Sequence, residues 1–209
     1  MPDMPEQNKP RFKFEATPSK PGTAINTRQP TQAEIDFIYP LVESYQAAGQ
    51  ALPNIHRIEE WDMPQPYRRL LAHDNDMTST LEHFHKAGIH VRAMEHFTDG
   101  LIYRREVVLL LDGTEEPVEF GSIRIRLTRF PAGAQRLIRE AYQPLGAILQ
   151  RCHIDFTSRP KGYIRVETDD VINMALGLSG RQWLYGRCNG LYNLERKILA
   201  DIVEILPPI

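Results

Sequence analysis

The sequence predicts an α+β fold in which helices pack on a single antiparallel β-sheet of about six strands. Three β-rich runs follow one another in the middle of the chain, at residues 89–95, 101–111 and 118–127. The dipeptide Asp112-Gly113 opens the turn between the last two runs. From Ser122 to Leu127 polar and apolar residues alternate, which predicts a strand with one face exposed to water.

Helices are expected before the first of these runs. The capping box Thr31-Gln-Ala-Glu34 predicts a helix that runs to about Ala48, although Pro40 disturbs it. Residues 67–73 predict a short helical turn, and 76–85 a longer helix.

That longer helix carries its own end signals. Asp76 or Thr78 is a candidate N-cap, and Gly88 is expected to end it.

After the three β-rich runs, helical and extended patterns alternate. The expected elements are a helix at 131–142, a short helical or loop segment from Pro144, a β-prone stretch at 154–166, a helix at 169–178, and strands at 182–188 and 198–206. These extended segments bring the number of strands to six.

The chain has 209 residues, which is long enough for one domain with a substantial core. Residues 1–30 hold six prolines among charged and small polar residues, so they are predicted to form a flexible arm ahead of a single domain at 31–209. The net charge of -2 gives no electrostatic reason to expect nucleic acid, and a small-molecule or protein partner is favoured.

No apolar leader and no run of 18 apolar residues is present in the sequence, so neither secretion nor membrane insertion is expected. The expected compartment is the cytoplasm. The two cysteines, Cys152 and Cys188, are far apart and lack metal-ligand spacing, so both are interpreted as reduced thiols.

Two charged residues interrupt the most apolar strand candidates: Arg105 in the run 103–111 and Glu204 in the run 198–206. Alternate residues of a strand share a face, so each charge lies among apolar neighbours and is buried if its face is covered. A buried charge requires a partner. An ion pair between Arg105 and Glu204 and a bound ligand between them are equally compatible with the spacing.

No phosphate loop, zinc spacing, nucleophile elbow or dinucleotide fingerprint occurs in the sequence, which favours cofactor-free chemistry or simple binding. Arginine is well shaped to hold a carboxylate, and a carboxylate in an apolar site can act as a general acid or base. Arg181 and Arg187 flank the penultimate strand and add to the candidate site.

Six motifs in order resemble the chorismate lyase family over roughly residues 65–208, in the branch that has Gly121-Ser122 in its middle strand. The motifs are Asp76-Met77-Thr78 with Gly88, Arg105-Glu106-Val107, Asp112-Gly113, Pro144-Leu145-Gly146, Leu184-Tyr-Gly-Arg187 and Val203-Glu204-Ile-Leu-Pro207.

The resemblance implies a monomeric α+β fold whose helical lids enclose an internal ligand cavity. It also implies an enzyme that eliminates pyruvate from chorismate to give 4-hydroxybenzoate without metal or organic cofactor. Position by position, Arg105 matches the residue that grips the ring carboxylate, Leu145 the residue whose backbone N–H touches it, and Glu204 the catalytic acid or base at the hydroxyl end. Met77, Gly146 and Arg187 match substrate-binding positions.

The sequence departs from the best-known branch at Val203 and Ser122, which implies a rebuilt second anion site and a modified chorismate-like substrate. The cation for the second carboxylate is left open among Arg187, Arg181 and Arg124. The resemblance also leaves room for a non-catalytic domain that binds an aromatic acid, because the same fold forms the effector domain of a class of bacterial transcription regulators. We do not expect this chain to have that ligand-sensing role, because residues 1–48 are too few to form the winged helix-turn-helix module that precedes the effector domain in those regulators. A third hypothesis makes Arg105 and Glu204 a structural pair without a pocket.

Overall fold

The computed structural model describes residues 36–209. The arm predicted at 1–30 and the capping box predicted at 31–34 lie outside the described residues. The helix expected after that box is α2 (Tyr39–Ala47), which begins one residue before Pro40. Proline is tolerated in the first turn of a helix because the N–H it lacks has no partner there, so Pro40 marks the beginning of α2 and does not break it.

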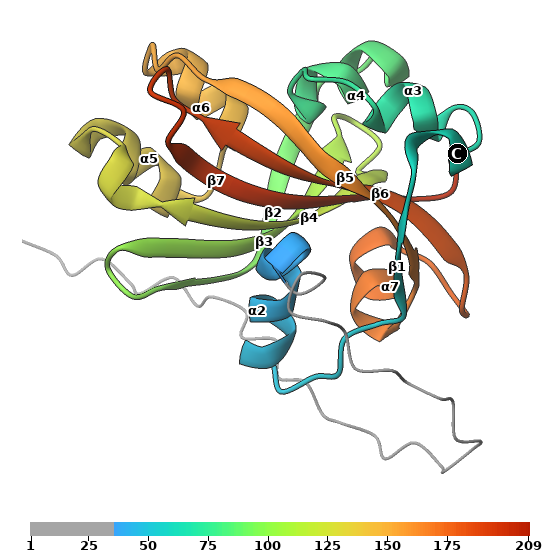
Figure 1. Cartoon of the computed structure of the whole chain (residues 1–209). Helices are drawn as coiled ribbons and strands as arrows, with labels where there is room; N and C mark the ends of the chain where they lie inside the picture. The colour runs from blue at the N-terminus through green and yellow to red at the C-terminus, as the bar shows by residue number, and fades with distance from the viewer. Residues whose placement is uncertain (1–35) are drawn as a thin grey trace, which may run out of the picture.

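The described residues form one antiparallel sheet of seven strands in the order β1-β5-β6-β7-β4-β3-β2 (Figure 1). The strands are β1 (Ile55–Ile58), β2 (Ile89–Thr98), β3 (Ile102–Leu111), β4 (Pro117–Arg126), β5 (Thr157–Glu167), β6 (Trp183–Tyr192) and β7 (Ile198–Leu206). The predicted fold class is confirmed. The strand that was not predicted is β1, which lies at the edge of the sheet and, among the described residues, pairs with β5 alone.

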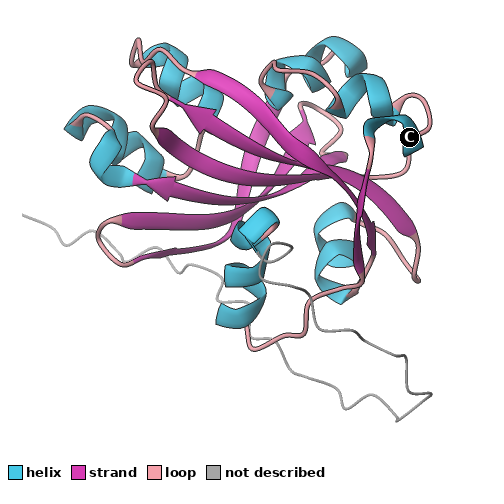
Figure 2. Cartoon of the chain, in the orientation of Figure 1, coloured by secondary structure: helices cyan, strands magenta, loops and turns pink. Residues whose placement is uncertain are grey.

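Short helices surround this sheet (Figure 2). They are α3 (Tyr67–Leu71), α4 (Met77–His85), α5 (Ala132–Glu140), α6 (Leu145–Arg151) and α7 (Asp170–Leu176), with 3-10 turns at Glu60–Asp62 and Leu127–Arg129. Asp76 caps α4 as predicted, because its side chain accepts a hydrogen bond from the Ser79 N–H at 2.9 Å. The predicted end of α4 at Gly88 was too late, since Lys86 already adopts the left-handed conformation.

Helices cover both faces of the sheet (Figure 1). Helices α2 and α7 lie on one face, and α3, α4, α5 and α6 lie on the other. The core under α2 and α7 includes Val108, Phe120 and Ile205, whereas residues one position along the strands, such as Val107 and Leu109, belong to the clusters on the opposite face. This alternation decides which side chains face the candidate site.

The water-exposed face expected for β4 is wrong. Ser122 is buried under α2, and its hydroxyl oxygen lies 3.1 Å from the hydroxyl of Ser44. Arg124, on the same face, forms an ion pair of 3.1 Å with Glu43. The polar side chains on this face of β4 therefore contact polar residues of α2, where water was expected.

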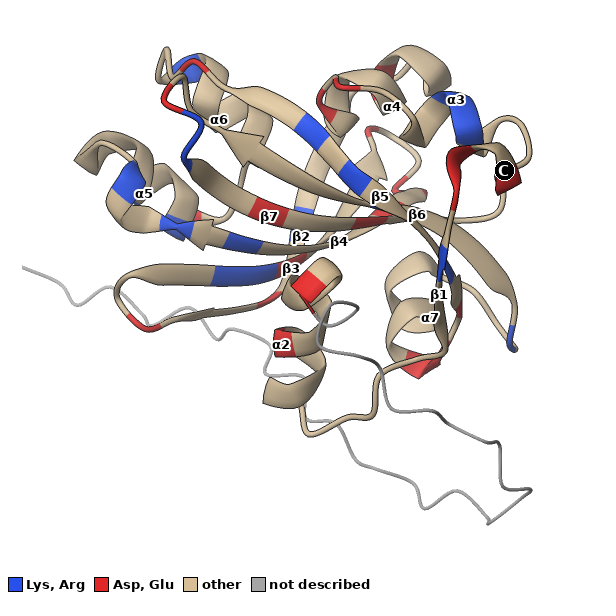
Figure 3. Ribbon diagram, in the orientation of Figure 1, with Lys and Arg blue, Asp and Glu red and all other residues tan. Residues whose placement is uncertain are grey.

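Acidic and basic residues are interspersed over the helices and strands of the described chain (Figure 3). Cys152 and Cys188 are both free thiols. Within residues 36–209, none of the helices has the length and apolar character required to cross a membrane.

Candidate functional site

The candidate site lies on the face of the sheet covered by α4 and α6. In the strand register, Arg105 on β3 is opposite Ile123 on β4, which in turn is opposite Ile202 on β7. One step along the same face, Val107 is opposite Gly121, and Gly121 is opposite Glu204. The sheet therefore aligns the two predicted charges in neighbouring rows, with β4 between their strands.

A cavity of about 60 Å³ lies between this face and the beginnings of α4 and α6. Its lining is mostly apolar and consists of Asp76, Met77, Thr78, Val91, Arg105, Val107, Leu109, Glu119, Ile123, Pro144, Leu145, Gly146, Phe156, Leu191 and Ile202. A cavity requires roughly 10–15 Å³ to hold one water molecule, so this cavity has room for a few waters.

Four of the six residues predicted for the site line this cavity: Met77, Arg105, Leu145 and Gly146. Met77 is the first residue of α4, and Leu145 is the first residue of α6 after Pro144. A Cβ added to Gly146 would lie 3.7 Å from the Asp76 side chain, so the beginnings of the two helices are in close contact. Together they close the cavity on the side away from the sheet.

Arg105 is the principal charge of the cavity, and only 2 % of it is exposed. Its Nη2 donates one hydrogen bond, to the Gln143 carbonyl at 3.2 Å. Its Nε and Nη1 have no hydrogen-bond partner among the described residues, and no carboxylate there pairs with it. Burial lowers the pKa of Arg105 to about 10, so the side chain is still a cation at neutral pH.

Glu204 is paired with Arg187, which was predicted to bind substrate. The two residues are opposite each other on β7 and β6 and are both buried. Arg187 Nε donates to Glu204 Oε2, and Nη2 lies 3.3 Å from Oε1. Burial is the largest single cause and lowers the pKa of Arg187, but the charge and hydrogen bond of Glu204, with further contributions from Glu119 and Tyr163, together raise it. Neither residue is among those that line the cavity.

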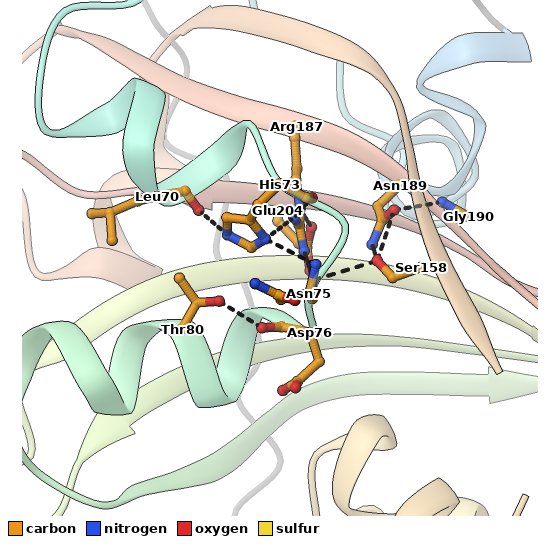
Figure 4. A network of polar contacts seen from close by, with 10 residues as sticks. All are labelled: Leu70, His73, Asn75, Asp76, Thr80, Ser158, Arg187, Asn189, Gly190 and Glu204. Carbon is orange, nitrogen blue, oxygen red and sulfur yellow. Dashed lines mark hydrogen bonds and ion pairs between the residues drawn. The ribbon is translucent and has the colours of Figure 1, made fainter. Parts of the chain in front are cut away.

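Arg187 also connects the sheet to the loop that leads into α4 (Figure 4). Its guanidinium donates to the carbonyl oxygens of His73 at 3.0 Å and Asn75 at 3.3 Å. Burial, and secondarily the nearby Arg187, lowers the pKa of His73. The Arg187–Glu204 pair therefore positions the chain just before Asp76 and Met77.

Asn189 and Ser158 extend this network (Figure 4). Asn189 Nδ2 donates to Ser158 Oγ at 2.9 Å, and that hydroxyl lies 3.4 Å from the Asn75 carbonyl. Through these bonds, β5 and β6 both contact the loop that leads into α4. Sequence analysis did not predict either residue, because neither is charged.

A second hollow, of about 390 Å³, lies beside the buried cavity. Its lining residues are Asp74, Asp76, Phe156, Thr157, Ser158 and Arg159. Asp76 and Phe156 line both spaces. A small molecule that reached the cavity through this hollow would pass these two side chains.

Glu119 on β4 lines the cavity and was not predicted. It is buried, and its Oε2 has no hydrogen-bond partner in the part of the chain that the structure describes. Burial, with the nearby Glu204 charge as a second cause, raises the pKa of Glu119 well above its usual range. Glu119 shares a strand face with Gly121 and Ile123, so the alternation that identified Arg105 also applies to it.

The other charged residues considered for the site lie outside the cavity lining. Within residues 36–209, no ion pair joins Arg105 to Glu204. Arg124 lies on the opposite face with Glu43, and the largely exposed Arg181 lies 3.6 Å from Glu167. No group of three potential metal ligands was found among the described residues.

Comparison with protein-family models gives no match, and comparison with curated proteins gives none either. Solved structures do match. PhnF from Mycobacterium smegmatis is similar with a TM-score of 0.52 and 11% identity over 80% of this chain and 93% of that chain. The effector domain of the same protein gives a TM-score of 0.48 at 13% identity over 63% and 87%. The ligand-binding domain of a putative GntR-family regulator from Bordetella bronchiseptica gives 0.46 at 13% identity over 57% and 85%.

The likeness to PhnF shows a shared fold, which is related to that of chorismate lyase. The prediction that this chain is a lyase is contradicted by this comparison: the matching structures include an effector domain and a ligand-binding domain of a putative regulator, and none of the three named above is a lyase. The roles expected of Arg105 and Glu204 in a site are not tested by the comparisons and stay predictions. Their places as binding or structural residues do not depend on a lyase activity.

Proposed function

We propose that this chain is a non-catalytic ligand-sensing domain that binds a small carboxylic acid with an apolar, ring-like body. The observation that carries this proposal is the state of Arg105. A cation that is almost fully buried faces the cavity with two nitrogens that lack a partner among the described residues.

The free energy of the site favours an anion at Arg105. Burying an uncompensated charge costs several kcal/mol even after relaxation of the protein. A ligand carboxylate would offset that cost by accepting a hydrogen bond from Nε or from Nη1, the two nitrogens that have no partner among the described residues, while Nη2 stays bonded to Gln143. The gain exists only in the complex, so it contributes directly to affinity.

The rest of the lining suits an apolar ligand body. Val107, Ile123 and Ile202 form the floor on the sheet, and Met77 and Leu145 close the opposite side. A ring acid is larger than a cavity of about 60 Å³. We therefore expect the beginnings of α4 and α6 to move outward when it binds.

Such a movement gives the domain a way to report its ligand. The loop before α4 is bonded to Arg187, so displacement of Asp76 and Met77 would be transmitted to β6 and β7. A ligand shifts an equilibrium only by its different affinity for the two states. Here the difference would come from the extra room that the carboxylate-bound form requires.

Isothermal titration calorimetry with a panel of small aromatic and alicyclic acids tests the proposal. We expect the unmodified protein to bind one of these acids. Arg105→Met should lower the affinity roughly 30-fold or more, because losing a buried charged contact costs about 2–5 kcal/mol. Arg151→Met is the matched control, since it removes an exposed arginine of α6. The acid should be recovered unchanged after incubation. Equal affinity in Arg105→Met, or no binding of any acid by the unmodified protein, would overturn the proposal.

A further inference from the structure

Glu119 gives the cavity a second polar end. It lies on β4 opposite Leu109 of β3, four residues from Ile123, which is opposite Arg105. Residues four apart on a strand share a face, so Glu119 and Arg105 point to the same side of the sheet. Both line the cavity, and the other residues of β3 and β4 that line it, Val107, Leu109 and Ile123, are apolar.

The position of the Glu119 carboxyl group follows from its contact with Gly121. A Cβ built on Gly121 would lie 3.2 Å from Glu119 Oε1 and 3.1 Å from Val107 Cγ2. The carboxyl group therefore leans along β4 over Gly121, toward the row that contains Arg105. Two residues of strand, roughly 7 Å, separate Gly121 from that row, which is about the width of a substituted six-membered ring.

The environment of Glu119 favours its neutral form. Burial and the negative charge of Glu204 both raise its pKa, although Arg187 opposes them. A protonated carboxyl group has one O–H donor and can also accept. Oε2 lacks a partner among the described residues, so this hydrogen-bonding capacity is not used within them.

We propose that the cavity recognises its ligand at two ends, with Arg105 binding the carboxylate and Glu119 binding a hydroxyl group on the far side of the ring. This inference rests on the proposed function and narrows the ligand class to hydroxylated ring acids. A hydroxyl group both donates and accepts, as Glu119 does. A second carboxylate at that end would be repelled by the Glu204 charge.

The test compares 4-hydroxybenzoate, 3-hydroxybenzoate, benzoate and terephthalate by titration calorimetry. We expect the unmodified protein to bind 4-hydroxybenzoate at least about 10-fold more tightly than benzoate, because an unpaired buried polar group is costly when the ligand lacks its partner. The 3-hydroxy isomer and terephthalate should gain nothing over benzoate. Glu119→Met should bind the two monoacids without preference, whereas Glu119→Gln should retain the preference.

Glu116→Met, which removes an exposed glutamate before the same strand, is the matched control and should bind as the unmodified protein does. Thermal unfolding of each variant verifies folding, and the comparison of ligands on the unmodified protein is decisive even if Glu119→Met does not fold. Equal, Arg105-dependent binding of benzoate and 4-hydroxybenzoate overturns this inference and leaves the proposed function intact. Absence of binding by every acid overturns the proposed function itself.

Discussion

Glu204 on β7 is paired with Arg187 on β6 and has no ion pair with Arg105 in the described part of the chain. Arg105 consequently has no carboxylate partner among the described residues. The two charges that interrupt apolar strands thus have different roles in the structure. Glu204 belongs to an internal pair that holds the loop before α4, whereas Arg105 faces a cavity.

Breaking the Arg187–Glu204 pair should be strongly destabilising. Arg187→Met leaves a buried carboxylate alone and removes the bonds to the loop carbonyls, so we expect the free energy of unfolding to fall by about 3–5 kcal/mol. The double variant Arg187→Met/Glu204→Leu should recover part of that loss. Urea denaturation of both single variants and the double variant gives the coupling energy. Additive effects would contradict the pairing.

Replacing Arg105 should have the opposite effect on stability. Arg105→Met exchanges a cation that lacks a carboxylate for an apolar side chain of similar length in an apolar cavity. We expect the free energy of unfolding to rise by about 1–2 kcal/mol while acid binding is lost. Such an exchange of stability for function is common where a binding site contains a buried charge without a partner. Chemical denaturation without ligand measures this, with Arg151→Met as control. A clear loss of stability would mean that Arg105 supports the fold.

The order of strands and helices could be predicted because its signals are local. Asp76 and Asp169 cap their helices within three residues of themselves, and apolar runs mark the long strands. Strand β1 was missed because its four residues have polar His56 and Arg57 at the centre and pair at one edge only. The exposed face expected near Ser122 was wrong because alternation cannot distinguish water from polar residues of another helix.

The candidate site was predictable in part. A charge inside an apolar strand indicates burial, which located Arg105 and Glu204, but spacing along the chain does not tell which strands are neighbours. Arg187 became the partner of Glu204 only through the pairing of β6 with β7. The same alternation applied to β4 would have found Glu119. The reaction could not be inferred from resemblance, since one fold serves different functions.

The buried face under α2 should make stability depend on pH through Glu106. Burial is the main cause that raises the pKa of Glu106 from 4.5 to about 7, with Glu95 and Asp169 adding to it and a hydrogen bond to Ser44 opposing it. The folded state therefore holds a proton that the unfolded state releases, and stability falls as pH rises between these two values.

Glu106→Gln should remove this part of the pH dependence. Because the side chain is partly exposed, we expect the variant to be more stable than the unmodified protein by only about 1–2 kcal/mol at pH 8, with little difference at pH 4.5. Urea denaturation from pH 4.5 to 8 measures the difference. The exposed Glu140→Gln on α5 is the control. A constant difference across the range would contradict a proton held by Glu106.

Gly186 should tolerate no side chain, because strands β6 and β7 approach closely beside the Arg187–Glu204 pair. A Cβ added to it would lie 2.4 Å from the backbone oxygen of Glu204, so the sheet itself would have to shift. We expect Gly186→Ala to lower the free energy of unfolding by about 2–3 kcal/mol. Gly133→Ala adds the same methyl group on exposed α5, where no heavy atom lies within 4 Å, and should stabilise by up to about 1 kcal/mol because alanine favours the helix. Urea denaturation should show changes of opposite sign in the free energy of unfolding for the two variants. An equal change in both would mean that β6 and β7 can separate at Gly186 to accept the methyl group at little cost.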